Sequence, residues 1–410
     1  MNLPLFIYNK LKNNSNKSNI SSRIIKIAIF SVFIGIFTSL SAVSIGKGLQ
    51  YSIKEMLFNV TPDISISSYD NINRGIASEI IKESDIIIDE INKLYPSIKL
   101  NFTLEKPSII TINNSVETLI FRGVKNEINS KKFDQFIEEK LVDIPQSLND
   151  VLISKSISDK LNITVGDNIK LFFQTNKYQR TPNIRNYRVY GIYQTDFPDF
   201  DSNYIIGDIG SLQSLYKLSS RDFGAIELII NEKERITGIK NHLLSEDVFL
   251  NNNLSIVNAQ EKYKNIFNWI SIFDFNILII LVLMIIVAII SIIISMLTLI
   301  FERIKMIGVM SSMGASNKLL GKVFFYQGID ILLRGIIPGN ILFIIVSLVQ
   351  NKYKMFSLDP NDYYVDSIPF KIDISYIISL NSIFILIGIV ILFITFSSIT
   401  KFVPTININS

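Results

Sequence analysis

The side chains that most often perform catalysis or hold metal ions are scarce in this sequence. The 410 residues include one histidine, His242, and no cysteine. The lack of cysteine excludes disulfides, thiol chemistry and thiolate metal sites. A zinc site or a Ser-His-Asp triad has almost no support either, since the single histidine falls in an expected surface helix. We therefore expect His242 to be an ordinary surface residue and expect no metal site.

A nucleotide-binding loop is equally poorly supported. Such a loop needs closely spaced glycines before a Lys-Ser or Lys-Thr pair. The nearest candidate runs from Gly314 to Lys322, but its glycines are too far apart and Val323 follows the lysine. The chain thus offers no ATP site of its own. We expect no cofactor on this chain and no enzymatic activity.

Asp330 and Arg334 are the exception to this shortage, because they are charged residues inside an apolar segment. Four residues apart and acid first, they share one helix face and can pair. Charges at membrane depth are costly and usually face protein or water. Two interpretations stay open: both side chains reach the nearby cytoplasmic surface, or the pair contacts another helix or a partner subunit. Gly335 and Gly339 predict close helix packing beside them.

Four apolar segments must position these residues, and 48% of the chain is hydrophobic against 19% charged. The charge-free part of the second segment, Ile277 to Ile300, is about 36 Å long as a helix, enough to cross a hydrocarbon core. A helix buried in a large soluble core would instead need a polar face elsewhere. The expected transmembrane helices are residues 24–46, 275–300, 328–349 and 374–400.

Basic residues predict the orientation of these helices. Residues 1–26 carry five lysines and arginines and no acid, and residues 302–327 carry four against one acid, Glu302. Basic flanks lie in the cytoplasm, so the N-terminus (1–23), the segment 301–327 and the tail (401–410) are expected inside. The loop 350–373 lacks this bias and is expected outside. A cleaved signal peptide is the competing interpretation, but the first apolar run is too long for one.

Residues 47–270 have the composition of an ordinary soluble domain. Alternating apolar residues predict strands near Asp63–Ser67 and at later positions, and helical spacing links Ile76 to Leu94. Further strands are expected near 108–112, 117–124, 168–173, 185–193, 203–206 and 225–230, with helices near 131–141, 154–161, 209–216 and 233–244. The predicted fold class is an α-helical membrane protein with four transmembrane helices and a large α+β extracytoplasmic (periplasmic) domain between helices 1 and 2.

The polar segment after the second span carries a family resemblance. Glu302-Arg303, then Ile307-Gly308, and then Met313-Gly314-Ala315-Ser316 with Gln327-Gly328, are similar to the motif of FtsX-like and MacB-type permeases. The resemblance implies that this segment docks on a cytoplasmic ATPase and couples it to the spans. The implied coupling residues are Glu302, Arg303, Ile307, Gly308, Met313, Gly314, Ala315 and Ser316. A solvated loop without such a role is the alternative.

Two other stretches resemble lipoprotein-releasing permeases of the LolC/LolE type. They are Leu358-Asp359-Pro360 through Pro369-Phe370 and Val189-Tyr190-Gly191 through Tyr204. The chain departs from the family pattern at Asp196 and at Leu332, where glycine is usual. The first departure concerns a local turn, and the second concerns one helix contact.

The resemblance implies a permease subunit of an ABC transporter that extracts lipoproteins from the cell inner membrane. Its partners would be an ABC ATPase dimer that binds the ATP, a second permease subunit (the same or different), the lipoprotein cargo, a periplasmic lipoprotein carrier and membrane lipids, with no nucleic acid. The alternatives are a MacB-type efflux permease, an FtsX-type division permease or a transmembrane sensor. A sensor would need an output domain that the short cytoplasmic segments do not provide.

The resemblance also implies where cargo enters, because the first two spans of this family line a cavity open to lipid. Here their outer halves are apolar, which suits acyl chains, although any span has apolar faces toward lipid. The residues expected to contact cargo or lipid are Val43, Ile45 and Leu49 on the first span and Phe273, Ile277, Ile280 and Leu281 on the second.

Overall fold

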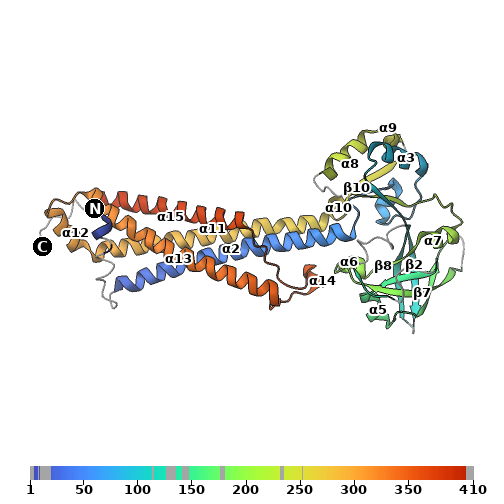
Figure 1. Ribbon diagram of the computed structural model, residues 1–410, viewed down its shortest axis with the longest axis horizontal. Helices are drawn as coiled ribbons and strands as arrows, with labels where there is room; N and C mark the ends of the chain where they lie inside the picture. Colours follow the sequence, from blue (N-terminus) through green and yellow to red (C-terminus); the bar gives the residue numbers. More distant parts are fainter. Residues whose placement is uncertain are drawn as a thin grey trace. The chain divides into compact units, whose positions relative to one another are not determined.

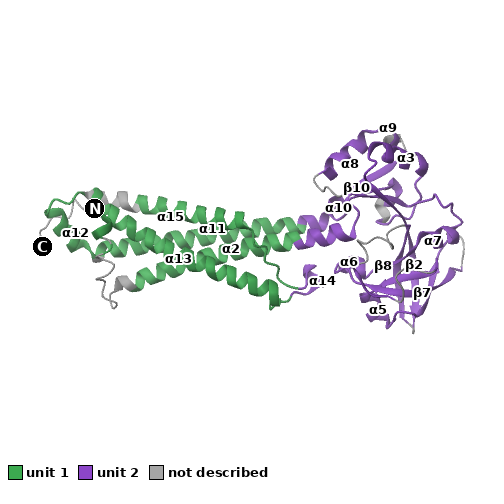
Figure 2. Cartoon of the chain, in the orientation of Figure 1, with its two compact units in different colours: residues 1–51, 269–357, 367–410 green, residues 52–268, 358–366 purple. Residues whose placement is uncertain are grey.

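The computed structural model describes residues 4–7, 9, 20–112, 115–125, 135–140, 147–175, 181–230, 235–251 and 253–402. The chain forms two compact units (Figure 2). We call residues 1–51, 269–357 and 367–410 the helical unit, and residues 52–268 and 358–366 the sheet unit.

Four long helices, α2, α11, α13 and α15, run side by side in the helical unit (Figure 1). All four are long and apolar enough to cross a membrane. Each is also longer than the span predicted from sequence, and α2 continues well past the first predicted span. Their bounds are Ile20–Val60 for α2, Lys264–Glu302 for α11, Asn317–Tyr353 for α13 and Ile374–Phe402 for α15.

Small residues let these helices approach closely. A Cβ atom built on Gly335 would lie 2.6 Å from Cβ of Val32, and one on Gly339 would lie 3.0 Å from Cγ2 of Ile36. The predicted close packing of this glycine pair is therefore confirmed, with α2 as the partner. Since lipid tails are as apolar as the helices, such close backbone approach is what favours helix association.

The sheet unit contains a ring of six paired strands. Strand β2 pairs with β3, which leads through β8, β5, β7 and β6 back to β2. Alternate side chains point into the ring, where aromatic residues including Phe121, Phe173 and Tyr187 are buried. The bounds are Lys99–Ile112 for β2, Ser115–Val124 for β3, Asp150–Ser154 for β5, Asn168–Phe173 for β6, Asn183–Tyr193 for β7 and Tyr204–Asp208 for β8.

Three more strands extend the sheet from β2, in the order β9, β1, β10. Helices α3, α8 and α9 belong to this part. Isoleucines and leucines of α3 and α8, with Phe249 of α9, form a second core with the strands. Strand β4 is the last strand beyond β7. The bounds are Ile64–Ser68 for β1, Ile137–Lys140 for β4, Ala225–Ile229 for β9, Leu254–Asn258 for β10, Ser84–Leu94 for α3, Ile236–Ser245 for α8 and Asp247–Asn251 for α9.

The remaining described helices are short and connect the longer elements, with α12 between α11 and α13. They are η1 (Tyr69–Arg74), α5 (Lys155–Leu161), α6 (Pro198–Asp201), α7 (Ile209–Tyr216), α10 (Ala259–Lys262), α12 (Ile304–Ser312) and α14 (Pro360–Tyr363). The prediction of a helix near 131–141 is wrong for the residues that the structure describes, since Ile137–Lys140 is a strand paired with β7. The remaining part of that prediction lies outside the described residues. The helix that ends at Leu94 begins only at Ser84.

Candidate functional site

The polar segment between α11 and α13 consists of one short helix, α12, and two tight turns. Helix α11 ends at Glu302, and Arg303 lies at the break before α12 with φ −102° and ψ 14°. Gly308 lies within α12 and does not interrupt it. The side chain of Glu302 lies outside the described part of the chain.

Gly314 ends α12 through a complete C-terminal capping motif. Its φ is +86°, the left-handed region that glycine adopts without strain. The Gly314 amide donates to the Ser311 carbonyl at 3.0 Å, and the Ala315 amide donates to the Met310 carbonyl at 3.0 Å. These two bonds define a Schellman motif and satisfy carbonyls that the helix end would otherwise leave unpaired.

The next helix begins immediately after this turn. Ser316 is the N-cap of α13, and its hydroxyl accepts a hydrogen bond from the Leu319 amide at 3.4 Å. The Gly-Ala-Ser sequence therefore has a structural role of its own: glycine ends one helix and serine starts the next. This role is independent of any docking partner.

The outer surface of α12 carries exposed apolar side chains. Met313 is 81% exposed and Val309 60% exposed, whereas Ile307 is 2% exposed and packs into the helical unit. A Cβ atom on Gly308 would meet no other atom within 4 Å. Lysines such as Lys305 and Lys318 are exposed beside these residues. An exposed apolar surface with a cationic border is typical of a protein-binding site.

Asp330 and Arg334 form an ion pair on α13, with Nε of Arg334 2.9 Å from Oδ2 of Asp330. Both side chains keep access to the surroundings, at 27% and 48% exposure. The pair thus lies on an outward-facing part of α13.

The residues predicted to contact cargo divide into three groups by exposure. Val43, Leu49 and Ile277 are buried in the helical unit, and a Cβ on Gly46 would lie only 2.4 Å from Cδ1 of Ile277. Ile280 is exposed. The other three, Ile45, Leu281 and Phe273, are half-buried.

A polar contact between α2 and α11 lies beside these residues and was missed from the sequence. Nζ of Lys47 is 2.6 Å from Oδ1 of Asp274, and Gln50 donates to the same atom at 3.0 Å. The contact joins residues more than 200 positions apart, so no local pattern predicted it. The sequence did contain a hint of this contact, however, because a single charged residue lies at the outer end of each charge-free run.

The two family departures noted in the sequence have clear structural outcomes. Asp196 has φ +60°, a conformation that favours glycine, and its carboxylate accepts a hydrogen bond from Gln194 at 2.6 Å. Leu332 fills the space above Gly388, where a Cβ atom would lie 2.5 Å from its Cδ1. A large residue on α13 is therefore matched by a glycine on α15.

The sheet unit contains a buried ion cluster that sequence reasoning also missed. Arg122 donates to Glu105 at 2.8 Å and to Glu227 at 2.8 Å, and all three side chains are at most 5% exposed. The Ala77 amide completes the cluster with a 2.9 Å bond to Glu105. Burial by itself raises the pKa of Glu105, but the positive charges of Lys262 and Arg122 outweigh it and lower that pKa. The cluster therefore stays ionised.

Comparison with known families identifies the chain. The family model described as MacB-like periplasmic core domain matches residues 27–244, more than half of the sequence, and the one described as FtsX-like permease C-terminal matches residues 278–404. The chain belongs to the FtsX-like and MacB-type permeases. A permease of this superfamily is the membrane subunit of an ABC transporter, and homologues of this kind imply an ATPase partner and a second permease subunit.

Relatives of this permease are similar along most of their length. The lipoprotein-releasing system transmembrane protein LolC of Buchnera aphidicola is 23% identical over 400 residues, 94% of each chain. The lipoprotein-releasing system transmembrane protein LolE of Haemophilus influenzae is 21% identical over 368 residues, 85% of this chain and 83% of that one. The solved periplasmic region of MacB from Actinobacillus actinomycetemcomitans matches with a TM-score of 0.32 and 17% identity, over 50% of this chain and 92% of that one.

Proposed function

We propose that this permease is the transmembrane subunit of an ABC transporter that extracts lipoproteins from the inner membrane. A separate ATPase dimer would bind the ATP and supply the energy, and a periplasmic carrier would accept the cargo. One observation carries the proposal: two relatives similar over most of the chain are both named as lipoprotein-releasing system proteins. The protein would then be a multi-pass inner-membrane protein.

The membrane frame that supports this proposal follows from the helical unit. Residues 27–46 of α2 lack charge, and Lys26 and Lys47 bound them. Such a run is about 30 Å long as a helix, the thickness of a hydrocarbon core. Lys47 pairs with Asp274 at one end, and the Ser295 hydroxyl contacts the Ile24 carbonyl at the other.

In this frame the sheet unit is the α+β extracytoplasmic domain between the first two spans, and α12 is cytoplasmic. Cysteines placed singly at the exposed positions Ser220 and Ser312 test the orientation in this cysteine-free chain. An impermeant thiol reagent should label the first from the periplasmic side. Labelling of Ser312→Cys from that side would reverse the proposed topology.

The energetics of lipoprotein extraction explain why a motor is required. Each buried methylene contributes about 0.8 kcal/mol, so three acyl chains of about 14 methylenes each hold a lipoprotein by roughly 30 kcal/mol. This exceeds the ceiling of roughly 20 kcal/mol on non-covalent affinity. Binding by an extracytoplasmic domain alone therefore could not remove the anchor. An ATP-driven step that moves the chains into another apolar site could.

The exposed surface of α12, Ile304, Val309 and Met313, is the proposed docking site for the ATPase. Gly308→Leu tests it sharply, because the position is open within this chain. The variant should fold normally and lose ATPase coupling by at least about fivefold, the effect of about 1 kcal/mol at an interface. Gly238→Leu is the matched control, since Gly238 is also helical and also meets no atom within 4 Å. Normal transport by Gly308→Leu would reject the docking site.

Cargo would enter beside Ile280, the exposed member of the predicted lipid-contacting set. A photo-crosslinking residue at Ile280 should capture an acylated protein. The same residue at Leu386, an exposed position on α15, serves as the control for general lipid contact. Equal capture at both positions would remove the case for a site on α11.

An efflux permease is the second candidate, because the MacB-like model matches the longest part of the chain. The experiment that separates the two traps cargo on the complex. The permease is co-expressed with its ATPase carrying an inactive catalytic base, and the purified complex is analysed for bound acylated protein. Recovery of triacylated lipoprotein supports release. Recovery of the complex without any acylated protein would reject the proposed cargo.

A further inference from the structure

A cleft of about 670 Å³ in the sheet unit has no part in the function proposed above. Strands β1 and β10 form one side of it, and residues of α6 and α10 form the other. Its volume falls in the range of small-molecule binding sites, roughly 300–1,000 Å³. The cleft is therefore large enough for a ligand of several rings.

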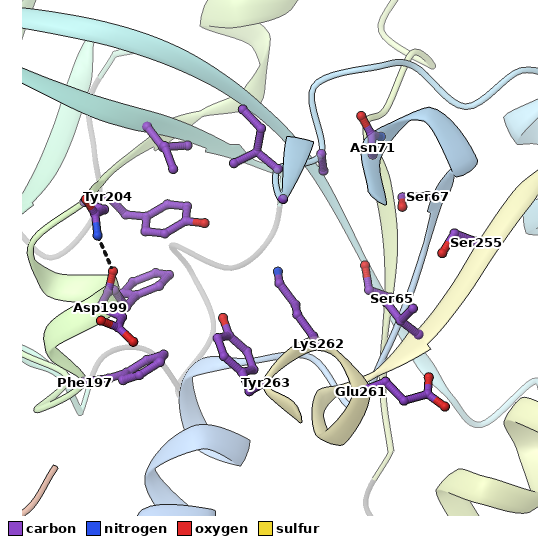
Figure 3. Close-up of a pocket in the computed structure, with 17 residues that line it drawn as sticks. Ser65, Ser67, Asn71, Phe197, Asp199, Tyr204, Ser255, Glu261, Lys262 and Tyr263 are labelled. Carbon is purple, nitrogen blue, oxygen red and sulfur yellow. Dashed lines mark hydrogen bonds between the residues drawn. The ribbon is translucent and has the colours of Figure 1, made fainter. Parts of the chain in front are cut away.

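Polar groups converge on this cleft from both sides (Figure 3). Lys262, Tyr263 and Tyr204 point their polar ends into it from one side. Ser65, Ser67 and Ser255 line the other side, and the register explains why: Ser67 pairs with Ser255 across β1 and β10, so their side chains share a face. The isoleucines that alternate with the β1 serines, Ile64 and Ile66, face the core on the opposite side of the sheet.

These groups have little bonding within the protein. Among the residues that the structure describes, the hydroxyls of Ser65, Ser255 and Tyr263 and the ammonium of Lys262 form no hydrogen bond or ion pair. Ser255 is only 6% exposed, and its hydroxyl is accessible from the cleft, since it is not among the buried polar atoms that lack a partner. A few convergent polar groups of this kind are what fix the orientation of a ligand in a binding site. Their convergence indicates a ligand that supplies the missing partners.

The charge of the cleft restricts that ligand. The row of residues that lines it continues across the sheet, since Ser65 lies opposite Glu227, which binds Arg122. Glu105 and Glu227 carry one negative charge more than Arg122, and Lys262 balances it. Of the two carboxylates that line the cleft, Glu261 pairs with Lys240, whereas Asp199 adds a negative charge. The surrounding protein alone would lower the pKa of Lys262, but Tyr263, Glu105 and Glu227 raise it above its usual value. The balanced cluster leaves no positive charge free for an anion.

The walls of the cleft exclude a second class of ligand. The half-buried rings of Tyr204 and Tyr263 provide aromatic surface. Phe197 and Phe200, only 1% and 6% exposed, lie behind them, and Phe200 stacks on Tyr204 with 4.6 Å between the ring centroids. An acyl chain could use that surface but would strip water from Lys262 and the serines without replacing their hydrogen bonds, which is costly. Aromatic faces next to hydroxyl groups instead match a molecule with apolar ring faces and hydroxyl edges.

We propose that this cleft binds a neutral, hydroxyl-rich ligand of the carbohydrate class. Sugar hydroxyls both donate and accept, so they complete the bonds of Ser65, Ser255, Tyr263 and Lys262 without adding charge. The aromatic side chains cover the ring faces. The site is independent of the lipoprotein cargo and of the docking surface on α12.

Titration of the full-length chain tests this proposal. The chain is reconstituted in lipid nanodiscs, because maltoside and glucoside detergents carry sugar headgroups that would compete. Maltotriose and triacetylchitotriose are the probes, with inorganic phosphate, glutarate and a neutral tetrapeptide for comparison. At least one sugar should bind and the anions should not. Binding of an anion or the peptide without either sugar would overturn the ligand class, and binding of nothing would overturn the site.

Three variants locate the site. Ser67→Phe fills the cleft and should abolish binding. Tyr263→Phe keeps the ring and its 5.4 Å contact with Phe197, and should weaken binding about fivefold, the effect of one neutral hydrogen bond. Ser220→Phe, at an exposed turn away from the cleft residues, should bind as the unmodified chain does. Equal affinity for all three variants would overturn the proposal.

Discussion

The two units of this permease both pack closely at glycines, but they differ in the charged groups that they bury. Helices of the helical unit meet at glycines such as Gly46, Gly335 and Gly388, where a Cβ atom would clash with the neighbouring helix. Its described ion pair within a span, Asp330 with Arg334, keeps partial exposure. The sheet unit instead buries a complete ion cluster around Arg122, in which every side chain is at most 5% exposed.

This difference reflects the two solvents. In lipid, burying apolar surface brings no gain between helices, so shape complementarity at small residues determines which faces meet. In water, apolar burial already drives folding, and a buried cluster is tolerated as long as every charge is paired. We therefore expect steric changes to damage the helical unit and charge changes to damage the sheet unit.

The largest effect is expected from Arg122→Met. The change leaves Glu105 and Glu227 buried without their partner, which costs about 3–5 kcal/mol. Hydrogen exchange of the β2 and β3 amides in the full chain measures this loss. Arg221→Met is the matched control, because Arg221 and Asp85 form an exposed pair that should contribute nothing measurable.

A triple variant of the same cluster separates the effect of unpaired charge from the effect of the changed side-chain shape. Glu105→Gln and Glu227→Gln, added to Arg122→Met, remove all three charges and should restore part of the stability. If Arg122→Met alone leaves the exchange rates unchanged, the cluster does not stabilise the sheet unit in the way described.

The second effect is a pH dependence that comes from Asp201. Burial raises its pKa from 3.8 to about 6, against the hydrogen bonds from Thr195 that lower it. A carboxyl group with a raised pKa in the folded state contributes stability below pH 4 that is lost as the pH rises through 6. The loss is about 3 kcal/mol for a shift of about two units.

Asp201→Asn should remove this dependence. The difference in sheet-unit stability between the unmodified chain and Asp201→Asn, followed by hydrogen exchange from pH 4 to pH 7, isolates the contribution of this group. A difference that stays constant over that range would show that Asp201 has an ordinary pKa.

A smaller loss, about 2 kcal/mol, is expected from Gly335→Leu in the helical unit. The new side chain would overlap Val32 and the Ile29 carbonyl, and overpacking of this kind typically costs 1–3 kcal/mol. Unfolding in mixed micelles measures the change. Gly308→Leu, the open position on α12, is the control for the substitution itself. Equal stability of the two variants would contradict the glycine contact.

The smallest effect concerns a polar contact between α13 and α15. Asn340 and Asn381 each donate to the other's side-chain oxygen at 2.8 Å. Interhelical hydrogen bonds in membranes contribute about 1 kcal/mol. A double-mutant cycle with Asn340→Leu and Asn381→Leu should give a coupling energy of that size. A coupling energy near zero would leave packing alone to hold these helices.

The sequence predicted the elements whose patterns are local. Strands β6 and β7 and helix α7 were expected within two residues of their observed bounds, because alternation and helical spacing are read within one segment. Strand β4 was predicted as a helix instead. Its residues follow no clear alternation, and pairing with β7, more than 50 residues away, determines its conformation.

Contacts between distant segments were the main omission at the candidate sites. The sequence showed Gly335 and Gly339 and predicted a packed face, but not that α2 is the partner. It showed single charges at Lys47 and Asp274 without indicating that they pair. The buried glutamates on β2 and β9 could be suspected only from their period-two spacing with apolar neighbours. The roles proposed for α12 and for Ile280 stay predictions.

The turn between α12 and α13 has a mechanical consequence. With Gly314 and Ser316 both serving as caps, the reversal contains almost no chain without hydrogen bonds. A connection whose backbone is hydrogen-bonded throughout is stiff. A displacement of α12 is therefore transmitted to α13 and is not taken up by the turn. Two glycines inserted after Ala315 would add slack to this joint. The ATPase would then still bind the permease, but the movement of α12 would deform the lengthened turn and would not reach the transmembrane part of α13.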